Sequence, residues 1–492
     1  MTLGLLLLYI ALIALALTLA AGFGLKRVQN WPLSYLQFFA GTLFVVSGWV
    51  KAIDPLGTAY KMGQYFAAFE GTFEATALSG IAPLFPFLSS YVESFAVIMI
   101  VFEIVLGIAL IVGYQSKLSA WAFLLLVLFF TVLTGFTYLT GYVPSGVNFF
   151  DFSNWGPYVA TNMKVTDCGC FGDFLKLEPK VSFLKDVALL VPAFIFIFSH
   201  KHMHQLGTPL LRKVAFWGAV PAWVLYCFSN FVWDLPHTDF RPFKIGVNVR
   251  EKKAQEMEAS QNVKIIAYRL TRKSNGETLE LPFDQFLKEM GKYPSDQWDM
   301  EQIKSEPAIA PTKISEFEVS NLDGTDVTDE LLGLQGYNFM IIAHHLEGTV
   351  QTKMATVPDT TFLTDTIRTA NSVELVQRVD KIGKRKVEVN AYSWDPEYLQ
   401  RWKEKVNPVM KAAAEKDIRA VAIVAYGGKE QIEDFKKAAG IDYPVLIADD
   451  ILLKTMIRSN PGPILFKDGT IVKNWHIRKF PAFEAIESEY IR

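Results

Sequence analysis

The chain has 492 residues, of which 51% are hydrophobic, and a formal net charge of −2 at pH 7. This length exceeds one ordinary domain, and a positive mean hydropathy is unusual for a soluble enzyme of this size. The balanced charge excludes a basic nucleic-acid-binding protein, and three cysteines are too few for a disulfide framework.

Long apolar segments dominate the first half of the chain, and about 20 apolar residues span a bilayer. The sequence therefore predicts six transmembrane helices, near residues 3–23, 34–53, 95–114, 119–140, 185–200 and 214–233. The fifth segment is long enough only if it begins near Ser182. The first lacks a preceding basic residue and is followed by Lys26 and Arg27, the reverse of a signal peptide. We therefore expect it to be retained.

Basic residues in the short loops predict the orientation of these helices. Lys26 and Arg27 follow the first segment, Lys117 follows the third, and Lys201 and Arg212 lie between the fifth and sixth. These loops are predicted to be cytoplasmic. The loops 54–94 and 141–184 and both termini would then face the periplasm of a two-membrane bacterium, which makes this an inner-membrane protein.

The chain after Asp234 has the pattern of a soluble α/β domain. Alternating apolar residues flank Asn275-Gly276, a strong hairpin signal. Further on, the predicted strands NFMIIAHH, RAVAIVAY, YPVLIAD and GPILFKDGTIV are separated by helical patterns. Strands that alternate with helices predict an α/β sheet.

Two of the three cysteines, Cys168 and Cys170, lie in the loop TDCGCFGDF. A bond between them would close a small strained ring, which makes a disulfide a better oxidant, and Gly169 supplies the backbone freedom. We hypothesise a redox pair that exchanges electrons with a partner protein or a quinone. Two alternatives stay open: a structural bridge from one of them to Cys227, or two inert thiols.

Glu103 lies within an apolar helix, where an ionisable group is costly and usually has a partner. It is predicted to carry a proton or to bind a quinone, or only to tie helices together. Lys51 and Asp54 end the second apolar segment, and Lys185 and Asp186 open the fifth. They are either interfacial charges and helix caps or part of the cysteine site, where a lysine would favour the reactive thiolate.

The histidines suggest no metal centre. His200, His202 and His204 alternate in SHKHMH and are predicted to form a solvated basic loop, because no carboxylate or cysteine accompanies them. His344 and His345 follow the predicted strand NFMIIAHH, with a metal or ligand role as the less favoured interpretation. The sequence also contains no phosphate-binding loop and no zinc motif.

The membrane half resembles the DoxX/MauE group of redox-associated membrane proteins. The resemblance rests on FFAGTLFVVSGWVKAIDPLGTAYKMGQYFAAF, DCGCFGDFLKL and SFLKDVALL, and covers residues 34–200. It is similar to a long form seen in Bacteroidetes that also carries a soluble C-terminal part. The resemblance implies a four-helix core, with the first and sixth helices as additions, and an association with redox chemistry.

The soluble half resembles a thioredoxin fold of the TlpA-like kind in its order of strands and in GPILFKDGTIV. The resemblance implies a cis proline before the penultimate strand, and we predict a cis Gly462–Pro463 bond, with Pro461 as the competitor. The expected Cys-X-X-Cys after NFMIIAHH is replaced by LEGTVQTKM, and an insertion follows. We therefore predict a binding module without its own dithiol chemistry.

Taken together, the sequence predicts a polytopic helical membrane bundle followed by an α/β thioredoxin-like domain. The predicted parts are an extra helix and linker (1–33), a DoxX/MauE-like domain (34–200), a sixth helix (201–234), a small β-rich subdomain (235–312) and a thioredoxin-like domain (313–492) with an insertion near 349–394. The expected role is periplasmic thiol–disulfide or quinone-linked redox chemistry. A non-catalytic scaffold of a cell-envelope complex is the alternative, so enzymatic activity is left undecided. The expected partners are the lipid bilayer, a quinone and a periplasmic thiol protein or envelope subunit, and no nucleic acid is expected.

Overall fold

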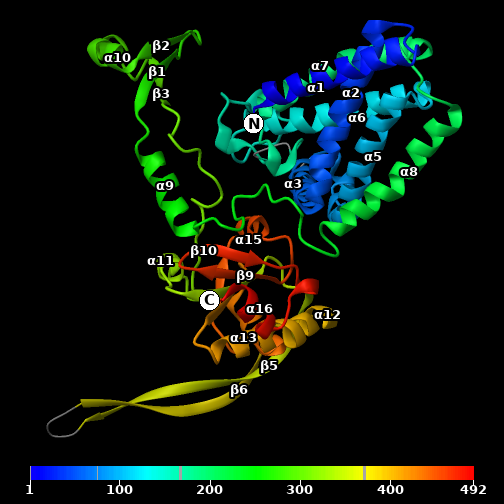
Figure 1. Ribbon diagram of the computed structural model, residues 1–492. Coiled ribbons are helices and arrows are strands. Elements are labelled where there is room, and N and C mark those ends of the chain that lie inside the picture. Colours follow the sequence, from blue (N-terminus) through cyan, green and yellow to red (C-terminus); the bar gives the residue numbers. More distant parts are fainter. Residues whose placement is uncertain (1, 75, 166–168, 369–372, 492) are drawn as a thin grey trace. The chain divides into compact units, whose positions relative to one another are not determined.

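The computed structural model describes residues 2–74, 76–165, 169–368 and 373–491. The chain forms two compact units, the first ending at Lys244 and the second beginning at Ile245, and Figure 1 shows the helices of the first and the strands of the second. A helical apolar bundle is thus followed by a region rich in strands, as the sequence predicts.

The described part of the first unit is built from helices. They are α1 (Leu3–Leu19), α2 (Trp31–Ile53), α3 (Pro55–Phe73), α4 (Leu84–Ser89), α5 (Val92–Val112), α6 (Ser116–Thr140), α7 (Pro179–Ser199) and α8 (Pro209–Ser229). Among the described residues, five helical stretches are long and apolar enough to cross a membrane: Leu3–Gly24, Trp31–Ile53, Val92–Val112, Ser116–Thr140 and Pro179–His202. The chain is therefore a multi-pass membrane protein by length and composition.

Two segments differ from the prediction. The sixth predicted span forms α8, but α8 is not among the five stretches, because Arg212 and Lys213 lie in its first turns and lower its hydropathy. Residues 54–94, predicted as a loop, contain α3 and α4. The α3 helix starts because the Asp54 carboxylate accepts a hydrogen bond from the Gly57 N–H (3.1 Å) and Pro55 follows the cap.

Helices α2 and α5 pack closely through glycines. Gly41 and Gly48 lie seven residues apart on one face of α2 and meet α5, which carries Gly107. A Cβ atom placed on Gly107 would lie 2.7 Å from the Gly41 carbonyl oxygen, and one on Gly48 would lie 2.4 Å from the Ile104 side chain. Small residues permit such backbone approach in membrane bundles, so these glycines set the separation of α2 and α5.

The second unit contains a central mixed sheet. Its strands are β4 (Tyr337–Ala343), β7 (Arg419–Ala425), β8 (Val445–Ala448), β9 (Gly462–Lys467) and β10 (Thr470–Asn474), in the order β10-β9-β4-β7-β8. β4, β7 and β8 are parallel, and β9 is antiparallel to both β4 and β10. The main helices of this unit are α9 (Val249–Gln261), α11 (Thr328–Leu332), α12 (Pro396–Gln400), α13 (Asn407–Ala414), α14 (Lys429–Ala439), α15 (Asp450–Met456) and α16 (Phe483–Tyr490). Phe339, Trp402, Phe435 and Leu465 belong to the core that packs on the sheet.

Two smaller β structures accompany this sheet. The hairpin predicted around Asn275-Gly276 is formed by β1 (Ile265–Arg272) and β2 (Thr278–Pro282), and β3 (Trp298–Lys304) completes the sheet β2-β1-β3, with α10 (Phe283–Glu289) after β2. The insertion forms a long antiparallel hairpin of β5 (Gly348–Arg368) and β6 (Val373–Trp394) (Figure 1).

The predicted cis peptide bond is misplaced. The structure has a cis bond at Asn460–Pro461, and the Gly462–Pro463 bond is not cis. Pro463 lies inside β9, where it pairs with Ile341 of β4. The prediction placed the start of this strand too late; because β9 begins at Gly462, Pro461 is the residue that directly precedes it.

The α2–α5 contact gives the first prediction. Replacing Gly107 with Leu should force α5 away from α2, because its Cβ alone already meets the Gly41 carbonyl and the Val45 side chain. We expect a loss of several kcal/mol, measured as a lower melting temperature of the detergent-solubilised protein. Gly218→Ala in α8 is the control, since nothing lies within 4 Å of that added Cβ. Equal melting temperatures for both variants would contradict the prediction.

Candidate functional site

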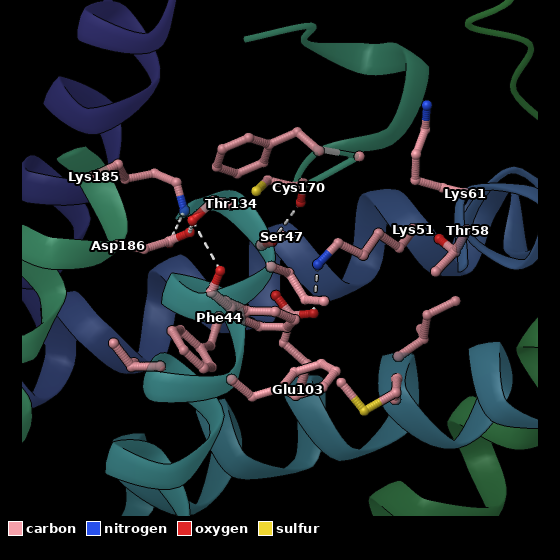
Figure 2. A pocket seen from close by; sticks show the side chains of 18 of the residues that line it. Phe44, Ser47, Lys51, Thr58, Lys61, Glu103, Thr134, Cys170, Lys185 and Asp186 are labelled. Atoms are coloured by element: carbon pink, nitrogen blue, oxygen red, sulfur yellow. Dashed lines mark hydrogen bonds and ion pairs between the residues drawn. The ribbon is translucent and has the colours of Figure 1, made fainter. Parts of the chain in front are cut away.

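The first unit contains a largely apolar cavity of about 90 Å³ whose polar lining residues come from six different segments. These include Lys51 of α2, Thr58 of α3, Glu103 of α5, Thr134 of α6, Cys170 of the loop before α7, and Asp186 of α7. Figure 2 shows Cys170 and the charged side chains gathered around this cavity. Residues that are far apart in the sequence therefore form one site.

The first ion pair joins Lys51 and Glu103. The Lys51 Nζ lies 2.6 Å from Glu103 Oε2, and the two residues are only 7% and 3% exposed. The ammonium also lies 5.1 Å from the centre of the Phe130 ring. A charge buried in this way is stable only beside its partner. Lys51 is thus the partner of Glu103, which could not be identified from the sequence.

The second ion pair joins Lys185 and Asp186 at the first turns of α7. Asp186 is 1% exposed and accepts a hydrogen bond from the Thr134 hydroxyl of α6 (3.1 Å). The Lys185 ammonium lies 6.0 Å from the ring centre of Phe171, the residue after Cys170. Both pairs are thus largely buried among the helices rather than exposed on the surface of the first unit.

The cysteine loop covers this cavity. The Ser47 hydroxyl of α2 donates a hydrogen bond to the Cys170 carbonyl (2.9 Å), and Phe171 is buried in the bundle core. Gly169 has a φ of +62°, a conformation that glycine adopts readily, and a Cβ there would lie 3.1 Å from the Lys61 side chain. Cys168 lies outside the described residues. Cys170 is therefore held directly beside the two ion pairs.

Two other predicted site residues lie elsewhere. Asp54 caps α3 and does not belong to the cavity lining. Cys227 carries a free thiol and is buried in α8 against Ala52, Val97 and Ile100. The structure therefore places Cys227 in a packing role rather than in a bridge to the loop. Among the described residues, no cluster of histidine, cysteine and acidic side chains could hold a metal ion.

The prediction of a solvated histidine loop is wrong for His204. This side chain is 1% exposed and stacks on Phe38 with ring centres 4.1 Å apart. Its Nε2 lies 2.9 Å from the Ile111 carbonyl oxygen, and its backbone N–H donates to the Gln37 side chain (3.0 Å). The contacts with Gln37 and with the end of α5 keep His204 buried in the first unit, whereas His202 is exposed.

His344 and His345 lie at the end of β4 in the second unit, beside a polar network. The Asn460 amide donates to the His345 carbonyl (2.8 Å) and to Glu347 (3.1 Å), and the Tyr398 hydroxyl also donates to the His345 carbonyl (3.1 Å). Burial, helped by the nearby cations Lys454 and Arg458, lowers the pKa of His344 to about 3. His344 is therefore neutral at pH 7.

No sequence pattern identifies Ser47 and Thr134 as site residues, because hydroxyl residues in apolar helices ordinarily bond their own backbone. Thr134 does bond the Phe130 carbonyl (2.8 Å), but it also reaches Asp186. Only the three-dimensional structure shows that Ser47 fixes the cysteine loop and that Thr134 fixes Asp186. Ser47 lies four positions before Lys51, but this spacing alone would not identify its contact with the cysteine loop.

Residues 29–146 match the family model described as Methylamine utilisation protein MauE. Over this stretch the chain is similar to MauE. No curated protein matches the chain, and no solved structure matches it. The MauE-like stretch covers α2 to α6 and so includes Lys51 and Glu103, but it ends before Cys170 and Lys185. It is shorter than the predicted resemblance over 34–200.

The buried pair gives the second prediction. Glu103→Gln leaves Lys51 buried without an anion, which costs about 3–5 kcal/mol, whereas replacing both residues with Met should cost clearly less. The measurement is thermal unfolding of the purified protein in detergent. Asp173→Asn, in the more exposed Lys176–Asp173 pair (3.5 Å), is the control and should change stability by less than about 1 kcal/mol. A double variant less stable than Glu103→Gln would refute the idea.

The low pKa of His344 gives the third prediction. The unfolded chain binds a proton near the ordinary pKa of about 6.5, but the folded chain does not until about pH 3. The stability that neutral His344 contributes is therefore complete above about pH 6.5 and is lost as the pH falls from there toward 3. Urea unfolding of the full chain at pH 7 and pH 5 should differ less for His344→Gln than for wild type, by up to about 2 kcal/mol. Equal differences in the two proteins would disprove this.

Proposed function

We propose that this protein is a membrane thiol oxidoreductase in which Cys168 and Cys170 cycle between dithiol and disulfide, with a membrane quinone as electron acceptor. The observation that carries the proposal is the position of Cys170 on a cavity that also contains two buried ion pairs. Intramembrane ionisable groups are costly and usually functional. A thiol next to such groups is suited to proton-coupled electron transfer.

The proposed reaction balances in atoms and electrons. A sulfur–sulfur bond forms between Cys168 and Cys170, two S–H bonds break, and the quinone receives the two electrons and two protons to become a quinol. A client dithiol then attacks the disulfide and is itself oxidised, which returns both cysteines to the thiol form. The attacking species is a thiolate.

The charged residues divide these tasks. Lys185 lies beside the cysteine loop, against Phe171, so its ammonium favours the thiolate form of Cys170; Lys51 is already paired with Glu103. Glu103 and Asp186 are the groups placed to accept the protons that the thiols release and to pass them to a quinone oxygen. Ser47 is a positioning residue, because its hydroxyl holds the Cys170 carbonyl.

The second unit is proposed to be a thioredoxin-like module that binds the client. The order β10-β9-β4-β7-β8, with β9 antiparallel to β4, supports this fold. The sequence after β4 contains no cysteine. In place of a dithiol it presents the polar network around His345 and Asn460, which suits binding rather than electron transfer.

The proposed location is the inner membrane, with the cysteine loop and the second unit on the periplasmic side. We propose that α8 also spans the membrane, because Leu210, Val214, Trp217 and Leu225 are exposed apolar side chains on it. Its cations Arg212 and Lys213 lie at the end predicted to be cytoplasmic. Six spans return the chain to the periplasm, where disulfides persist.

The fourth prediction tests the redox pair by thiol trapping in intact cells. After acid quenching and alkylation with a heavy maleimide, wild type should show a mixture of reduced and oxidised forms that shifts toward reduced when quinone is depleted. Cys170→Ser should abolish the shift while the protein stays inserted. Cys227→Ser, which removes a buried thiol outside the site, is the control and should shift like wild type. If Cys168 and Cys170 show the same redox state under every condition, the result contradicts the proposal.

The absence of cysteine from residues 245–492 also favours a second candidate, a non-catalytic scaffold of a cell-envelope complex. A scaffold would copurify with a stable partner but form no mixed disulfide. The redox protein should instead trap a mixed-disulfide partner when Cys168 or Cys170 alone is replaced by Ser. The same trapping gel therefore separates the two functions.

A further inference from the structure

A second cavity, which we call the aromatic groove, lies between α3, α6, α7 and the loop after α6. Its volume is about 370 Å³, and Phe69, Phe73, Val132, Gly135, Phe136 and Phe183 are among its lining residues. No charged side chain is among the residues that line it. Volumes of roughly 300–1,000 Å³ suit ligands of moderate size, and this lining suits only an apolar one.

The aromatic groove is next to the cavity lined by Cys170 and the two ion pairs, which we call the redox cavity. Residues on one face of α3 line both of them. Thr58, Met62 and Tyr65 line the redox cavity, and Phe69 and Phe73 line the groove. Their spacing of three and four residues puts them on one helix face. The rings of Tyr65 and Phe69 stack with centres 6.1 Å apart. Tyr65, whose hydroxyl lies 2.6 Å from the Thr137 hydroxyl, therefore stands between the two cavities on this face.

The groove also opens toward the lipid. Val132 lies at its edge on α6 and is 65% exposed, and α6 is one of the stretches apolar enough to span a membrane. Gly135 keeps the floor open, since a Cβ there would lie 3.1 Å from the Phe183 ring. The site thus has a polar end with proton-carrying groups and an apolar end open to the bilayer.

We infer that the aromatic groove binds the polyprenyl tail of the quinone whose ring reacts in the redox cavity. This rests on the proposed function and narrows its substrate to a lipid-soluble quinone with a long branched tail. A flat ring with two oxygens matches the end beside Glu103 and Asp186, and an apolar chain matches the phenylalanine walls. For the tail to pass from one cavity to the other, the Tyr65 ring must turn aside and give up its hydrogen bond with Thr137.

The fifth prediction tests this with the reduced full-length protein in nanodiscs and two quinones that share a ring, one with a polyprenyl tail and one without. Gly135→Leu fills the floor of the groove, and Val132→Trp fills its edge without touching a buried contact. Both variants should raise the KM for the tailed quinone about tenfold and leave the KM for the tail-less quinone unchanged. Leu128→Phe, an exposed position on α6 outside both linings, is the control and should change neither value.

Two results would overturn the inference. One is an unchanged KM for the tailed quinone in both groove variants. The other comes from a photoreactive polyprenyl quinone analogue, which should label groove residues: labelling that excess phospholipid removes as well as excess polyprenyl quinone does would show an ordinary lipid site. The analogue needs no turnover, so it tests the groove even if wild type reduces neither quinone, a result that would count against the proposed function alone.

Discussion

The buried pair of Lys51 and Glu103 constrains the whole membrane unit. Neither charge is tolerable alone in an apolar bundle, so α2 and α5 must place the two side chains in contact before the bundle is stable. The glycines of α2 and α5 allow this approach, because at Gly41 and Gly107 the backbones themselves are in contact. The same two helices contribute Ser47, Lys51 and Glu103 to the cavity, and Ser47 holds the cysteine loop beside them.

The two ion pairs differ in how they are built, and this difference matters for chemistry. Lys51 and Glu103 come from different helices and lock them together. Lys185 and Asp186 are adjacent in α7, so their pairing costs little conformational entropy and depends on Thr134 for its orientation. The first pair therefore joins two helices directly, whereas the second lies within one helix and reaches α6 through the Thr134 hydroxyl.

Hydropathy predicted five spans well, because a run of about 20 apolar residues has few other stable environments. It did not predict α3, because an amphipathic helix beside the bundle has neither the apolar length of a span nor the turn residues of a loop. Glu103, Lys185 and Asp186 were identifiable as unusual charges, but their ion-pair partners depend on how the helices pack.

In the second unit, the strands of the central sheet could be predicted from apolar runs. The hairpin of β5 and β6 could not, since the sequence of its strands is rich in Thr and Lys and resembles a polar insertion.

The hairpin contacts the rest of the second unit at its base. There Trp394 pairs with Gly348, packs edge-on against Phe435 (5.2 Å between ring centres) and donates a hydrogen bond to Asp434 (2.7 Å). Strands of 21 and 22 residues extend about 70 Å at roughly 3.3 Å per residue. The base of the hairpin, at Gly348, is therefore one residue from Glu347, which accepts a hydrogen bond from the Asn460 amide. A change in the direction of these long strands at Gly348 would first disturb that hydrogen bond, at the end of β4.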